Sequence, residues 1–418
     1  MLRVFSIIIS LTVIILIQSC SADKETISEG IWQAKIFREQ TAIPFLLDFK
    51  ASKDKRNYIV HAVNGDERLL MDSSYVENDS IHIPMQLFDS EIVAKAGKDK
   101  LEGIWKRYRQ GVQIGSLPFT ADYNKTYRFT PEETSAITSK NSVTGKWNTT
   151  FVAADGKDSV KAVGLFEQKG NIVTGSFLTA TGDYRYLAGT LQQDSLHLST
   201  FDGSHLYLFR AKLAQDGSLK GDFHAGLQGF QTWQAFKDPE ATLPDAGSLT
   251  YLNPGYETLD FSFPDAKGNM ISNKDPRFEG KVLIIQIMGS WCPNCMDETN
   301  FLAPWYKENR QRGIEIVGLT YEQSKDLAVS KPKMLKMVER FGIEYPIVLA
   351  GSREKESAAA SLPALNHIMS FPTTIIVDKN KKVRHIHTGF NGPGTGHYYD
   401  EFVEEFNQLI DKLVAENN

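Results

Sequence analysis

Cysteine is scarce in this chain of 418 residues, which has only three: Cys20, Cys292 and Cys295. A disulfide framework in a secreted protein uses several scattered pairs, and a zinc site would need two more ligands at suitable spacing. The sequence offers neither pattern. Cys292 and Cys295 are separated by two residues, and a lone C-x-x-C pair is most consistent with redox chemistry.

Runs of lysine and arginine are also missing, and the net charge is −5 with an isoelectric point near 6.0. Such a chain has no general electrostatic attraction to a phosphate backbone, so we expect no nucleic-acid partner. The hydrolase pattern G-x-S-x-G and the metalloprotease pattern H-E-x-x-H are absent as well. We therefore expect neither a metal site nor a cofactor.

Long apolar runs are confined to the N-terminus, where Val4 to Ile17 follows Arg3. This run is shorter than the roughly 20 residues of a transmembrane helix, which indicates a secretory signal peptide. It ends at Ile17-Gln18-Ser19-Cys20, which resembles a bacterial lipobox. The resemblance implies a signal peptide at 1–19, lipidation of Cys20 and a lipoprotein held in the cell envelope facing the periplasm. An ordinary signal peptide followed by an incidental cysteine is the alternative.

The remaining length predicts at least two globular domains, because single cores stop growing well below 400 residues. Residues 25–237 consist of short alternating runs separated by turn pairs such as Asn64-Gly65, Asp202-Gly203 and Asp216-Gly217. This pattern is typical of antiparallel strands joined by tight hairpins. We therefore expect an N-terminal all-β antiparallel meander, either a barrel or a sandwich.

This β-rich region also shows an internal repeat. The segment Gly30-Ile31-Trp32 recurs as Gly145-Lys146-Trp147, and Asp79 to Ile83 recurs as Asp194 to Leu198, each 115 positions later (30 to 145 and 79 to 194). A near-constant offset predicts two tandem units, 25–130 and 140–237. The repeat also matches His82 with His197. A metal site is conceivable for these histidines, but each is alone on its strand, which favours a structural role.

Beyond a linker at 238–250, rich in proline, aspartate, alanine and glycine, the pattern changes to alternating strands and helices. Apolar runs predict strands, and amphipathic stretches predict helices at 293–311, 330–341 and 399–416. The predicted strands are 281–289, 314–320, 345–350, 373–378 and 383–388. The alternation predicts an α/β domain over 251–418.

The segment Gly289-Ser290-Trp291-Cys292-Pro293-Asn294-Cys295 follows a predicted buried strand and opens a predicted helix. With Gly280-Lys281, Glu298 and Phe371-Pro372-Thr373-Thr374, it resembles the TlpA/ResA-like family of membrane-tethered thioredoxin-like disulfide oxidoreductases. The resemblance runs from about Tyr251 to the C-terminus. It implies a thioredoxin-like fold, with a central sheet covered by helices on both faces.

The two cysteines have different expected roles. Cys292 would lie at a helix N-terminus, where unpaired N–H groups and the helix dipole favour a thiolate, so it is the predicted nucleophile. Cys295 lies three positions on along the same helical face and is the predicted resolving cysteine. Together they would form the redox-active disulfide.

The resemblance assigns further residues around this pair. It implies that Glu298 faces the buried thiol, whereas an exposed carboxylate that complements the helix dipole is the alternative. It also implies that Pro372 is a cis-proline and that Phe371 lies against the active-site sulfur and pairs with an extended substrate. Trp291 is expected to shield the disulfide.

The sequence therefore predicts an extracytoplasmic thiol-disulfide oxidoreductase of the protein disulfide reductase type. Expected partners are disulfide-containing protein substrates, a membrane thiol reductase that donates electrons, and the membrane itself through the lipid anchor. One alternative is a ligand-binding surface lipoprotein in which the β-rich region dominates. Another is a thiol peroxidase, although the P-x-x-x-T-x-x-C pattern is absent.

Overall fold

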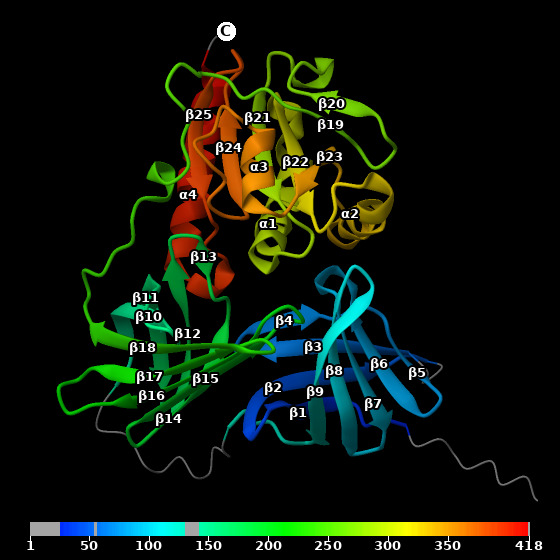
Figure 1. Ribbon diagram of the computed structural model, residues 1–418, viewed down its shortest axis with the longest axis vertical. Coiled ribbons are helices and arrows are strands. Elements are labelled where there is room, and N and C mark those ends of the chain that lie inside the picture. Colours follow the sequence, from blue (N-terminus) through cyan, green and yellow to red (C-terminus); the bar gives the residue numbers. More distant parts are fainter. Residues whose placement is uncertain (1–25, 54–56, 130–141, 417–418) are drawn as a thin grey trace, which may run out of the picture.

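A computed structural model of the chain describes residues 26–53, 57–129 and 142–416. The predicted signal peptide and Cys20 lie outside these residues. Two β barrels lie side by side, and an α/β domain formed by the C-terminal part sits over both of them (Figure 1). Within the described ranges, none of the helices has the length and apolar character needed to cross a bilayer.

The first barrel is an antiparallel sheet with the strand order β2-β1-β9-β8-β7-β6-β5-β3. Pairing of β2 with β3 closes the ring, and β4 extends from β3. A short 3-10 helix, Gln86–Phe88, joins β6 to β7. The strands are β1 Gly30–Arg38, β2 Thr41–Ala51, β3 Asn57–Asn64, β4 Glu67–Leu70, β5 Ser74–Glu77, β6 Ser80–Met85, β7 Ser90–Ala96, β8 Lys100–Arg109 and β9 Val112–Tyr123.

The second barrel repeats this order as β11-β10-β18-β17-β16-β15-β14-β12, closed by pairing of β11 with β12 and extended by β13. The predicted duplication is therefore confirmed, and each unit is a closed barrel rather than a sandwich. The strands are β10 Gly145–Ala153, β11 Ser159–Lys169, β12 Ile172–Thr179, β13 Gly182–Asp183, β14 Leu187–Gln192, β15 Ser195–Phe201, β16 Leu206–Leu213, β17 Leu219–Ala225 and β18 Gly229–Lys237.

Three of the hairpins form where the sequence places glycine in a turn. Gly65, Gly203 and Gly217 have positive φ values of 60°, 91° and 80°. Glycine adopts this left-handed backbone without the steric cost that a Cβ atom imposes. These residues connect β3 to β4, β15 to β16 and β16 to β17, as the turn pairs predict.

Large aromatic side chains fill both barrels. Phe201 of β15 crosses between them, because its ring stacks on Phe45 of the first barrel at a centroid distance of 4.3 Å. Phe201 therefore packs in the core of the first barrel, and the second barrel has a separate aromatic core. The fully buried aromatic residues of the two barrels are Trp32, Phe45, Phe49, Trp105 and Phe119 in the first, and Trp147, Phe151, Phe177, Phe201 and Phe209 in the second.

The C-terminal domain is a five-stranded sheet, in the order β23-β22-β21-β24-β25, within the described residues. Strands β21 to β23 are parallel, and β24 and β25 are antiparallel to their neighbours. A small hairpin, β19 Ser262–Pro264 and β20 Met270–Ser272, precedes the sheet. The strands are β21 Val282–Met288, β22 Ile314–Glu322, β23 Ile347–Ser352, β24 Thr373–Val377 and β25 Val383–Thr388.

Helices cover both faces of this sheet. Every residue of the central strand β21 is buried, and successive side chains enter two separate cores. One core includes residues of α1 Pro293–Asn309, α2 Leu327–Phe341 and α4 His397–Ala415, and the other includes α3 Lys355–Ser361. This arrangement confirms the predicted thioredoxin-like domain. The predicted helix at 330–341 begins earlier, at Leu327, because the Asp326 carboxylate caps the backbone N–H of Ala328.

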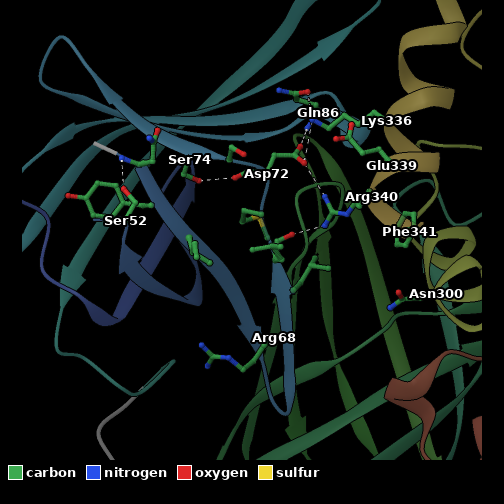
Figure 2. A pocket seen from close by; sticks show the side chains of 17 residues that line it. Ser52, Arg68, Asp72, Ser74, Gln86, Asn300, Lys336, Glu339, Arg340 and Phe341 are labelled. Atoms are coloured by element: carbon green, nitrogen blue, oxygen red, sulfur yellow. Dashed lines mark hydrogen bonds and ion pairs between the residues drawn. The ribbon is translucent and has the colours of Figure 1, made fainter. Parts of the chain in front are cut away.

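Helix α2 docks on the first barrel through charged side chains. Arg340 donates to the carbonyl of Leu70 at 2.6 Å and pairs with Asp72 at 3.2 Å. Lys336 also faces Asp72, and Lys333 pairs with Asp89. Figure 2 shows Asp72 beside Lys336 and Arg340. All three line a cleft, which has a volume of about 1040 Å³. Ion pairs therefore help to fix this side of the C-terminal domain against the barrels.

Candidate active site

The two cysteines lie where β21 passes into α1. Cys292 is the N-cap residue of the helix, and its sulfur accepts a hydrogen bond from the backbone N–H of Cys295 at 3.3 Å. Pro293 occupies the first helical position, where its missing N–H is not needed. Cys292 is 6% exposed and Cys295 is fully buried, and both are free thiols. Any reagent therefore meets Cys292 first.

The loop before β24 covers the outer thiol. The peptide bond between Phe371 and Pro372 is cis, as the sequence resemblance implied. The Cys292 thiol donates to the carbonyl of Phe371 at 3.3 Å. The Phe371 ring meets Trp291 edge to face at 5.6 Å, and the Trp291 indole N–H donates to the carbonyl of Tyr321 at 2.8 Å. Trp291 and Phe371 thus lie together beside Cys292.

Glu298 is buried one turn after Cys295, rather than exposed at the helix surface. Its carboxylate accepts hydrogen bonds from Gln286 at 2.8 Å and from Thr374 at 2.6 Å. Burial raises the pKa of Glu298 to about 7, and the two hydrogen bonds only partly offset that effect. The carboxyl group can therefore exchange a proton near neutral pH.

The Cys295 thiol is strongly held in its protonated form. Burial, the largest cause, raises the pKa of Cys295 well above its usual value, and the adjacent Cys292 and Glu298 raise it further. Desolvation disfavours a thiolate, and a nearby negative charge adds to the penalty. Cys295 must therefore lose its proton at the moment it reacts.

Comparison with known proteins identifies this arrangement. The family model described as Redoxin matches residues 253–401. The thiol-disulfide oxidoreductase ResA of Geobacillus kaustophilus is 32% identical over 142 residues, which is 34% of this chain and 72% of that protein. The chain belongs to the ResA-like family of thiol-disulfide oxidoreductases.

A second curated relative and a solved structure match a similar share of the chain. ResA of Halalkalibacterium halodurans is 26% identical over 156 residues, which is 37% of this chain and 76% of that protein. The solved thioredoxin domain of a thiol-disulfide oxidoreductase from Bacteroides vulgatus is 24% identical and covers 37% of this chain and 99% of that structure, with a TM-score of 0.29. The ResA-like part is thus little more than a third of the chain.

A buried carboxylate that the sequence did not reveal supports the ResA-like motif from behind. Glu322, at the end of β22, accepts hydrogen bonds from the Ser290 backbone N–H at 3.0 Å and from its hydroxyl at 2.6 Å. Burial raises the pKa of Glu322. These bonds hold the turn that precedes Trp291 and Cys292.

The second barrel reaches the cysteines as well, which the sequence did not predict. Arg185 is 3% exposed and donates to the carbonyl of Pro293 at 3.1 Å. It also pairs with Asp297 of α1 at 2.8 Å, with Asp202 at 3.3 Å, and with Glu67 of the first barrel. This cluster, which we call the Arg185 junction, joins both barrels to the helix that carries the cysteines.

A cleft of about 340 Å³ lies between the second barrel and the cysteines. Cys292, Trp291 and Phe371 line it from the ResA-like domain, and Thr181 and Tyr207 are among the residues that line it from the barrel. The larger cleft in Figure 2 has no cysteine among its lining residues. We therefore place the redox chemistry in the smaller cleft.

The matched histidines of the repeat have local partners instead of a shared site. His82 pairs with Glu91 at 2.8 Å and stacks on Tyr75, whereas His197 stacks on Phe129. No group of three or more His, Cys, Asp or Glu side chains is placed to hold a metal ion in the parts of the chain that the structure describes.

Proposed function

We propose that this chain is a lipid-anchored, extracytoplasmic reductase of protein disulfides. The observation that carries the proposal is that a partly exposed sulfur lies next to a fully buried one. Cys292 lies at a helix N-terminus against the Phe371 carbonyl, and the fully buried Cys295 lies directly behind it. A thiol in the position of Cys292 can attack a disulfide from outside, and Cys295 is placed to resolve the product.

The proposed reaction is a two-step exchange. The Cys292 thiolate attacks one sulfur of the substrate disulfide, and the substrate S–S bond breaks to release a thiolate, which takes up a proton. A mixed disulfide with Cys292 remains. Cys295 then loses its proton and attacks the Cys292 sulfur, which releases the second substrate thiol. The substrate gains two electrons and two protons, and Cys292 and Cys295 end as a disulfide.

Glu298 is the proposed proton acceptor for Cys295. Because the pKa of Glu298 is about 7, its carboxyl group is partly ionised at neutral pH, which suits a general base. The hydrogen bonds from Gln286 and Thr374 stabilise the ionised form until the proton arrives. Ionised Glu298 also disfavours a lasting thiolate on Cys295, so the proton leaves only as the new S–S bond forms.

The same electrostatics supports the reducing direction. Strongly oxidising members of the thioredoxin superfamily stabilise the reduced, thiolate form of their cysteine pair. Here burial and Glu298 oppose ionisation of Cys295. The reduced pair therefore gives up its electrons readily, and we propose that a membrane thiol reductase restores them. The lipobox-like segment ending at Cys20 supports anchoring near such a partner.

The alternative hypothesis of a ligand-binding lipoprotein finds little support in the barrels. Their interiors are filled by aromatic side chains such as Trp32, Trp147 and Phe177, each less than 2% exposed. A barrel that captures a ligand in its lumen needs an open interior. The thiol peroxidase alternative has no observation in its favour beyond the shared use of a cysteine.

A direct assay tests the proposal. The fully reduced chain is mixed with an unfolded protein that carries a disulfide, the reaction is stopped with an alkylating reagent, and both proteins are analysed by mass. For each substrate disulfide that is reduced, we expect the chain to take up two fewer alkyl groups, because Cys292 and Cys295 have become a disulfide. If the chain is still alkylated at both cysteines and the β region binds a defined ligand, the ligand-binding lipoprotein would be favoured.

A further inference from the structure

The β12–β13 hairpin is hydrogen-bonded to three segments near Cys292. The carbonyl of Thr181 accepts a hydrogen bond from the Ser370 hydroxyl at 2.7 Å, next to Phe371. The carbonyl of Asp183 accepts from the Asn294 amide at 3.2 Å, and its carboxylate accepts from the backbone N–H of Gly392 at 2.6 Å. The hairpin is therefore bonded to the C-x-x-C turn, the cis-proline loop and the loop between β25 and α4.

The contact is too close to admit another chain between the hairpin and these loops. A Cβ atom on Gly182 would lie 2.5 Å from the Asn294 side-chain nitrogen, and one on Gly389 would lie 2.8 Å from the Thr181 carbonyl carbon. Neither distance is sterically allowed without movement. The hairpin thus lies where the loops around Cys292 would otherwise be open to a large protein surface.

Access to Cys292 remains through the 340 Å³ cleft, and the barrel side of that cleft is rigidly built. The His205 ring stacks on Tyr207 at 4.6 Å, and its Nδ1 atom pairs with the Asp202 carboxylate at 2.9 Å. The Tyr184 ring lies 5.6 Å from Tyr207. Packed and hydrogen-bonded side chains of this kind hold a preformed wall.

The cleft volume indicates what can enter. Pockets that bind small molecules have volumes of about 300–1,000 Å³. At about 340 Å³, this cleft is at the lower end of that range, and it exposes only 6% of Cys292. A folded domain that carries a disulfide on a broad surface would collide with the second barrel before its sulfur reached Cys292.

We propose that the β12–β13 hairpin is the second wall of the substrate site and restricts Cys292 to sterically uncrowded disulfides. These are disulfides of small molecules or of short, unfolded peptide segments, rather than disulfides within compact folded proteins. The inference rests on the proposed reductase function. It adds that the second barrel determines specificity for the reaction at Cys292, with the Arg185 junction holding the wall in place.

The test compares three disulfides with the full chain: cystine, a short peptide with one disulfide, and insulin as a compact folded protein. Gly182→Leu wedges the hairpin away from Asn294. Its matched control is Gly170→Leu, because Gly170 also has a positive φ, of 64°, in a turn of the same barrel but has no atom within 4 Å of an added Cβ. Ser204→Trp instead fills the cleft from the barrel side.

The wedge should raise kcat/KM for insulin by about tenfold, equivalent to about 1.4 kcal/mol, while cystine changes by less than about twofold. Ser204→Trp should lower kcat/KM for cystine and the peptide by about tenfold. Gly170→Leu should match the unmodified chain. If Gly182→Leu misfolds, Ser370→Ala removes the bond to Thr181 without backbone strain and should change selectivity in the same direction.

If Gly182→Leu raised kcat/KM equally for cystine and insulin, the inference would be overturned. The hairpin would then cover Cys292 without discriminating between substrates. An unchanged insulin rate would overturn it too. Failure of the unmodified chain to reduce any of the three disulfides would instead refute the proposed reductase function. The two failures are therefore distinguishable.

Discussion

Arg185 of the second barrel donates a hydrogen bond to the carbonyl of Pro293, the residue that follows the proposed nucleophile Cys292. The same guanidinium pairs with Asp297, two residues after Cys295. A side chain from a barrel outside the ResA-like region is thus bonded both within the C-x-x-C motif and just after it. The β region is therefore part of the environment in which the cysteines react.

Replacing Arg185 should destabilise the protein more than replacing Arg340, whose ion pair with Asp72 is less deeply buried. Arg185→Met leaves the carboxylates of Glu67, Asp202 and Asp297 without their buried cation, which should cost about 3–5 kcal/mol. Arg340→Met, at the more exposed contact with Asp72, should cost about 1 kcal/mol or less. Urea denaturation of both variants measures the difference. Equal losses would show that the Arg185 junction contributes no more than the Arg340–Asp72 pair.

Glu298 should make stability depend on pH. Its pKa is about 7 in the folded chain, above the ordinary value of 4.5, so the folded state retains a proton that the unfolded state has lost. Stability from this group is therefore present below pH 4.5 and is lost as the pH rises through 7. As the pH rises from 4.5 to 8, the free energy of unfolding of the unmodified chain should fall more than that of Glu298→Gln. The difference should be on the order of 3 kcal/mol. Parallel stability profiles for the two proteins would contradict the assignment.

The same substitution should slow resolution of the mixed disulfide. Glutamine cannot accept the proton of Cys295, so the second step of Glu298→Gln should be slower and should no longer accelerate as the pH passes through 7. Stopped-flow measurement of that step, started from a purified mixed disulfide, separates it from the first attack. A rate that keeps the pH dependence of the unmodified chain would assign the proton transfer to another group.

Cys20 should determine membrane attachment. If it is acylated, Cys20→Ala should release the protein from the membrane fraction or stop its maturation. Cys295→Ser serves as the control, since it also removes one thiol but leaves the anchor intact. Fractionation followed by immunoblotting measures the distribution. Tight membrane attachment of Cys20→Ala would remove the lipoprotein proposal.

Much of the site could be predicted because its parts are local in sequence. Cys292, Cys295 and Glu298 fall on one helix at three-residue spacing, which fixes their common face before the fold is known. Phe371 and Pro372 are distant in sequence, and only the family resemblance pointed to them. The barrel units were visible because hairpin turns and the 115-residue offset leave a direct trace in the sequence.

What the sequence missed depends on contacts between domains. Arg185 is 108 residues before Pro293, and nothing near it marks it as part of the redox site. In the sequence, Asp183 and Thr181 look like ordinary hairpin residues. Their role is seen only in the contacts between the second barrel and the C-terminal domain. Helix α3, Lys355–Ser361, was missed for a different reason: it has only seven residues, too few to show an amphipathic period.

The order of the two sulfurs is the central claim, and trapping of mixed disulfides tests it most directly. Cys295→Ser removes only the resolving thiol, so a substrate attacked by Cys292 should stay covalently bound as a high-mass band on non-reducing gels. Cys292→Ser should trap far less, because Cys295 is fully buried behind the helix N-terminus. The account predicts abundant, reductant-sensitive adducts in Cys295→Ser alone. Equal trapping by Cys292→Ser would contradict it.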